Sequence, residues 1–106
     1  METLADKLAL LGRHVERAVA ALGSDRGASP VLVAVVHEFE AKFKKASAGL
    51  ASDSAHARDY VVEVEQAADS ARVGAMADRG ITEETRKLID LAHHAICLIK
   101  FEDKQP

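Results

Sequence analysis

Apolar residues recur at alternating steps of four and three positions in four separate stretches of this chain. In the first stretch the repeating residues are Leu4, Leu8, Leu11, Val15, Ala18 and Leu22. This spacing puts them all on one side of an α-helix, because about 3.6 residues complete a helical turn, and it does not fit the two-residue period of a strand. A helix with one apolar stripe buries that stripe against other helices. The spacing therefore predicts a helical bundle.

Three breaks separate the four stretches. The first break covers residues 23–28 and contains two glycines. The second contains Gly49 and the polar residues 52–54, and the third is at Gly80. Ser29 and Thr82 each stand before a new stretch and are expected helix N-caps. We predict helices over about residues 2–22, 30–48, 54–79 and 83–100. Short connections between consecutive helices favour an all-α, antiparallel up-down-up-down four-helix bundle.

The last three stretches differ in the size of their apolar residues. The second repeats Leu32, Val36, Phe39, Phe43, Ala46 and Leu50, and the third repeats Ala57, Val61, Val64, Ala68, Ala71 and Ala75. The fourth has a wide apolar face of Leu88, Leu91, Ala92, Ala95, Ile96, Leu98 and Ile99. The small residues of the third stretch predict close helix approach. Because this helix is expected to be the longest, it should kink or overhang, and an overhang would leave apolar surface for a second copy.

Local patterns add two finer predictions. Gly80 suits the left-handed residue that ends a helix, with Ile81 packing back on Met76 as in a Schellman motif. Glu38 with Lys42, and Glu40 with Lys44, have the favourable order for ion pairs one helical turn apart.

The 106 residues make one domain, 1–106, whose tail at 101–106 is expected to fray. A net charge of −3 gives no basic field for nucleic acid, and no apolar stretch is long enough to span a membrane. The acidic start does not fit a signal peptide, so a cytoplasmic protein is expected. Cys97 is the single cysteine, which excludes an intramolecular disulfide.

Reactive side chains concentrate on the last helix, at Asp90, His93, His94 and Cys97. Imidazole and thiolate groups one turn apart are half of a site for zinc, copper or iron, and His37 is a candidate for a further ligand. Di-iron bundles use Glu-x-x-His, which is absent from this chain. The alternative is that these residues only pack or face solvent.

Arg86 and His93, with six residues between them, offer a different chemistry. Their spacing resembles the Arg-x(4–6)-His pattern of HEPN-type RNases, which are helical bundles, and the resemblance covers these two residues alone. It implies an arginine that binds phosphate and a histidine that transfers a proton. The net acidity disfavours an RNA substrate, and a solvated helix face explains the same pair.

Three functional hypotheses follow. The first is a non-catalytic interaction module without a cofactor, which forms a homo-oligomer, most simply a two-fold dimer, or docks a partner helix. The second is a metal-binding bundle that uses the cluster on the last helix. The third is RNA cleavage through Arg86 and His93.

Overall fold

Four helices of nearly equal length make up the structure. The computed structural model describes residues 3–52 and 54–103, with the side chains of 51, 52, 54 and 100–103 left aside. The helices are α1 (Leu4–Gly23), α2 (Pro30–Ser52), α3 (Ala57–Ala77) and α4 (Glu83–Asp103), and a 3₁₀ turn, Ser54–His56, precedes α3. Helix α4 therefore runs past the expected end at residue 100, and the rest of the tail, 104–106, lies outside the described residues.

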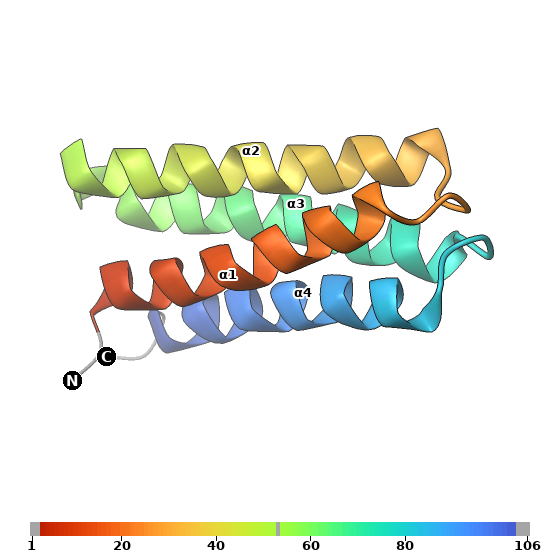
Figure 1. Cartoon of the computed structure of the whole chain (residues 1–106). Coiled ribbons are helices and arrows are strands. Elements are labelled where there is room, and N and C mark those ends of the chain that lie inside the picture. The colour runs from red at the N-terminus through yellow and green to blue at the C-terminus, as the bar shows by residue number, and fades with distance from the viewer. Residues whose placement is uncertain (1–2, 53, 104–106) are drawn as a thin grey trace.

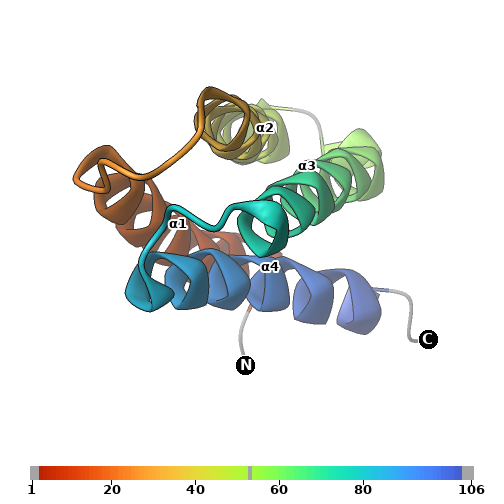
Figure 2. The ribbon, with the colours of Figure 1, turned by 90° about the vertical axis from the view of Figure 1, so that its right-hand side faces the viewer.

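The helices form an up-down bundle, as the sequence predicted (Figure 1). Each packs against its neighbours in sequence, and α1 packs against α4, which closes the ring. Figure 2, which looks along the bundle, shows the α1–α2 and α3–α4 loops together at the near end. The α2–α3 connection lies at the far end, where α1 begins and α4 ends.

The expected overhang of the third helix is wrong. With 21 residues, α3 matches α4 and is shorter than α2, which has 23. The reason is local: the first residues of the predicted helix form the separate 3₁₀ turn, and α3 ends at Ala77. Close approach to α2 does occur, because a Cβ on Gly74 would lie only 3.2 Å from a methyl of Val35. Glycine at this position lets the two helices meet.

The core follows the predicted stripes on α1, α2 and α3, but the stripe on α4 is rotated. The buried apolar residues of α4 are Ile89, Ala92, Ile96 and Ile99. Leu91 and Leu98, which the sequence assigned to the core, are 49% and 48% exposed. The apolar face of α4 is wider than the core can cover, so one edge of it stays at the surface. That edge forms part of a groove described below.

Both predicted N-caps are confirmed. The backbone N–H of Leu32 donates to Ser29 Oγ at 3.2 Å, and the backbone N–H of Thr85 donates to Thr82 Oγ1 at 3.2 Å. The predicted left-handed Gly80 is wrong, since no described glycine has a positive φ. Helix α3 ends instead with Asp78 in an extended conformation, and Met76 is 60% exposed rather than packed.

The two loops at one end of the bundle hold each other through two aspartates. Asp25, in the α1–α2 loop, accepts from the backbone N–H of Thr82 at 2.9 Å and from the hydroxyl of Thr85 at 2.8 Å. Asp78, in the α3–α4 loop, accepts from the backbone N–H of Ser29 at 2.8 Å. These reciprocal hydrogen bonds join residues about 50–60 positions apart in sequence. We call this arrangement the loop clasp.

Backbone packing in the loop clasp requires glycine on both sides. A Cβ on Gly27 would overlap the carbonyl oxygen of Gly80, and a Cβ on Gly80 would overlap that of Gly27. The hydrogen bonds also lower the pKa values of the two carboxyl groups. The backbone N–H of Thr82 chiefly lowers the pKa of Asp25, and the backbone N–H of Ser29 chiefly lowers that of Asp78.

Candidate functional site

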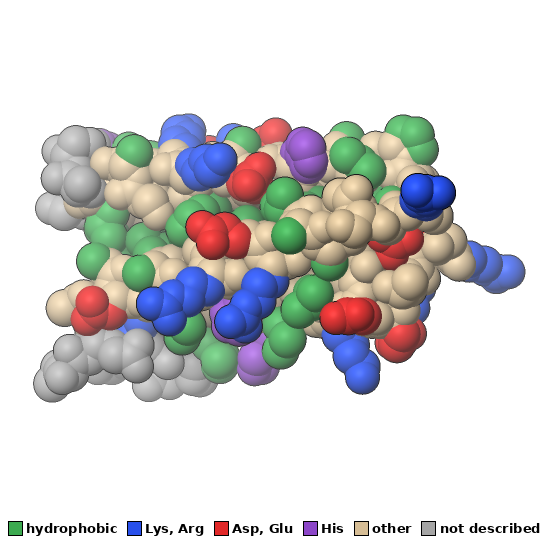
Figure 3. All heavy atoms as spheres, viewed as in Figure 1, with side chains coloured by type: hydrophobic (Ala, Val, Ile, Leu, Met, Phe, Trp, Pro, Cys, Tyr) green, Lys and Arg blue, Asp and Glu red, His purple; other side chains and the backbone are tan. Residues whose placement is uncertain are grey.

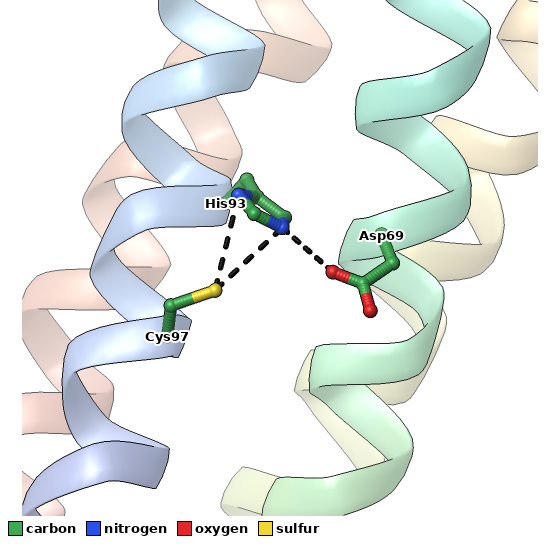
Figure 4. A group of neighbouring side chains, drawn as sticks. All are labelled: Asp69, His93 and Cys97. Atoms are coloured by element: carbon green, nitrogen blue, oxygen red, sulfur yellow. Dashed lines mark hydrogen bonds and ion pairs between the residues drawn. The ribbon is translucent and has the colours of Figure 1, made fainter.

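Three side chains with metal-binding atoms converge between α3 and α4. The carboxylate of Asp69 reaches across from α3, and its Oδ1 lies 2.6 Å from Nε2 of His93 on α4 (Figure 4). The Sγ of Cys97 lies 3.6 Å from the same nitrogen and 3.8 Å from Nδ1. One donor atom from each residue falls within 4.8 Å of the other two. We call this group the Asp-His-Cys cluster.

Helix geometry explains why these three residues meet. His93 and Cys97 are four positions apart, so they lie one above the other on the same face of α4. Asp69 stands opposite because α3 and α4 run antiparallel from a tight loop, and Asp69 and His93 are equally far in sequence from Ile81. Arg72 of α3 and Asp90 of α4 are likewise equally far in sequence from Ile81, and they form an ion pair at 3.9 Å.

Burial within the cluster is graded. The side chain of His93 is 17% exposed and that of Asp69 is 52% exposed, with Cys97 at an intermediate level. The imidazole is therefore fixed between helices, whereas the carboxylate projects from the surface and has room to change rotamer. The cluster opens to solvent on the Asp69 side.

The other residues predicted as ligands lie elsewhere. Asp90 pairs with Arg72, His94 points away into a groove between α1 and α4, and His37 is exposed on α2. The sequence placed both His93 and His94 on the last helix with Cys97, and in the structure it is His93 whose ring lies beside the Cys97 thiol. The sequence analysis did not select Asp69. Its position could have been found by pairing residues of α3 and α4 that are equally far from Ile81 in the loop between them.

A groove of about 350 Å³ runs between α1 and α4. Leu10 of α1 and Leu91 and Leu98 of α4 line it, and each is about half exposed. Among the side chains that the structure describes, its polar lining consists of Lys7, His14 and His94, and none of these is a carboxylate. On the face drawn in Figure 3, hydrophobic and histidine side chains lie together over α4. We call this surface the α1/α4 groove.

The guanidinium of Arg86 is used inside the fold. Its Nη2 donates to the carbonyl of Asp78 at 2.8 Å and its Nε to the carbonyl of Ala75 at 3.3 Å, so it satisfies carbonyls at the end of α3. Its Nη1 pairs with Glu83 at 2.8 Å. His93 contacts Asp69, so both members of the RNase-like pair have partners within the fold.

Comparison of the chain with protein-family models, curated proteins and solved structures found no match. Among the described residues, the helices lack the combination of length and apolar character that crossing a bilayer requires.

Proposed function

We propose that this protein is a helical interaction module that pairs with a second copy of itself through the α1/α4 groove. The supporting observation is the set of large apolar side chains on adjacent helices, Leu10, Leu91 and Leu98, each about half exposed around one concavity. Apolar side chains gathered around a groove are typical of binding surfaces, whereas single exposed leucines need no explanation.

A second copy fits this surface for two reasons. The residues of α4 that line the groove are Leu91, His94, Ala95, Leu98 and Ile99, and the two half-exposed leucines among them lie about two helical turns apart on one face. Two antiparallel α4 helices related by a two-fold axis can therefore place each Leu91 against the other copy's Leu98. The chain is acidic overall, but the described side chains that line the groove include no carboxylate, so pairing through them does not bring acidic groups together.

The size of the patch sets the expected strength. Three half-exposed leucines make a small apolar surface compared with the roughly 800 Å² per partner of a standard interface. We therefore expect a reversible dimer whose population rises with protein concentration, rather than an obligate one.

Sedimentation equilibrium over a wide concentration range tests this function. Leu98→Glu places a charge in the groove and should leave the protein monomeric, because in the dimer each glutamate would be buried against Leu91 of the other copy. Val73→Glu is the matched control: Val73 is 63% exposed on α3, outside the groove, and this variant should dimerise like the wild type. Circular dichroism of both variants checks that they keep their helices.

Two results would contradict the proposal. One is a wild-type protein that remains monomeric at the highest concentration. The other is a dimer that survives Leu98→Glu but is lost in Val73→Glu, which would place the interface on the α2/α3 side of the bundle.

A further inference from the structure

We infer that the Asp-His-Cys cluster binds one divalent transition-metal ion of the zinc class, with Asp69, His93 and Cys97 as its protein ligands. The sequence predicted a metal site at Asp90, His93, His94 and Cys97 on α4, with His37 on α2 as a further candidate. In the structure only two of the α4 residues take part, and the third donor comes from α3. The inference is separate from the proposed dimer, because the groove uses a different face of α4.

The distances between donor atoms fit such an ion after one adjustment. Nitrogen and sulfur ligands on a tetrahedral zinc ion lie about 3.5 Å apart, given Zn–N near 2.0 Å and Zn–S near 2.3 Å. The Nε2 of His93 and the Sγ of Cys97 are already 3.6 Å apart. Nitrogen and oxygen ligands need about 3.4 Å, whereas Asp69 and His93 are at the hydrogen-bond distance of 2.6 Å.

Asp69 can make that adjustment at little cost. Its side chain is half exposed, so a change of rotamer meets solvent rather than packed atoms. His93 and Cys97 are more enclosed and keep the spacing that a metal requires. The structure thus combines two fixed ligands one turn apart on one helix with a third, adjustable ligand on the neighbouring helix.

The donor set selects the class of metal. One thiolate sulfur, one imidazole nitrogen and one carboxylate oxygen suit a borderline ion such as zinc, whereas calcium and magnesium take oxygen ligands. Three protein ligands leave a fourth tetrahedral position, on the exposed side, for water. Because the thiolate is the ligand, binding at neutral pH releases the proton of the Cys97 thiol to solvent.

The experiment titrates reduced, chelator-free protein with zinc against a chromophoric competitor, and with cobalt(II) as a spectroscopic probe. We expect one zinc per chain and a cobalt spectrum with a thiolate-to-metal band. Cys97→Ser and His93→Gln should each weaken zinc binding by about 100-fold or more, and Asp69→Asn by roughly 10–100-fold. Zinc should raise the thermal midpoint of the wild type and not that of Cys97→Ser.

His94→Gln is the matched control, because His94 is the next residue along α4 and lies in the groove. It should keep the wild-type zinc affinity and cobalt spectrum. Failure of the wild type to bind stoichiometric zinc would overturn the inference and indicate that Asp69 and His93 form an ordinary ion pair. Binding unchanged by Cys97→Ser or by Asp69→Asn, or abolished by His94→Gln, would overturn the assigned ligands.

Discussion

The loop clasp and the Asp-His-Cys cluster both rest on aspartates that reach between elements, yet they differ in what the carboxylates meet. Asp25 and Asp78 accept hydrogen bonds from backbone N–H groups and a threonine hydroxyl. Asp69 meets the imidazole of His93, with the Cys97 thiol alongside. Backbone donors are fixed by the fold, whereas imidazole and thiol groups can exchange protons for a metal ion.

The polar groups of the loop clasp hold the fold together, whereas those of the Asp-His-Cys cluster are accessible to a ligand from solvent. In the loop clasp, Thr85 is 3% exposed, and its hydroxyl donates to Asp25 and lies 3.1 Å from the hydroxyl of Thr82, so removing the aspartate would take one of two hydrogen-bond partners from a buried polar group. The Asp-His-Cys cluster opens to solvent, and its carboxylate is half exposed. We therefore expect changes in the clasp to affect folding and changes in the cluster to affect metal binding.

The largest effect on stability is expected from Gly27→Ala. A methyl group there overlaps the backbone carbonyl of Gly80, which cannot move aside as a side chain could, so we expect a loss of about 2–3 kcal/mol in the free energy of unfolding. Gly23→Ala is the matched control, because a Cβ there meets nothing within 4 Å, and it should stabilise the protein by about 0.4–1 kcal/mol. Urea denaturation measures both. Equal stability of the two variants would show that the loops do not pack as described.

A smaller effect, dependent on pH, is expected from Asp25→Asn combined with Asp78→Asn. The folded protein holds the pKa of both carboxyls below the ordinary value, so their contribution to stability is complete above that value and is lost as the pH falls through the lowered one. The wild-type urea midpoint should therefore decrease below about pH 4, and that of the double variant should start lower and decrease less.

Glu63 provides the control for the acid effect. Hydrogen bonds from Lys42, and then from Lys45, lower its pKa as well, but they join exposed or half-buried side chains. Glu63→Gln should keep most of the wild-type loss of stability in acid. If Glu63→Gln removed the acid effect and the double aspartate variant retained it, the loop clasp would not be its source.

The smallest effect on stability is expected from Asp69→Asn. It removes the charge of a half-exposed carboxylate that contacts His93, and contacts of such exposed charges contribute about 0–1 kcal/mol. Without added metal, its urea midpoint should stay close to that of the wild type. A destabilisation as large as that of Gly27→Ala would give Asp69 a structural role and remove its contrast with the loop clasp.

Local sequence patterns predicted most of the fold and only part of the cluster. The apolar stripes, the caps at Ser29 and Thr82 and the Glu–Lys pairs of α2 were all readable, because each depends on residues within one or two helical turns. The cluster needed an inter-helix contact. His93 and Cys97 were recognised from their spacing, but Asp69 gains significance only once α3 and α4 are in register.

The sequence by itself determined that the chain forms four helices in one bundle, because helical periodicity and capping are short-range and each stripe demands a partner. The tertiary structure decided which edge of α4 faces the core, since the apolar face from Leu88 to Ile99 is too wide for the space available and leaves Leu91 and Leu98 outside. It also decided the partners of Asp25, Asp69 and Asp78. These contacts depend on the register between elements distant in sequence, which is fixed only when the whole core packs.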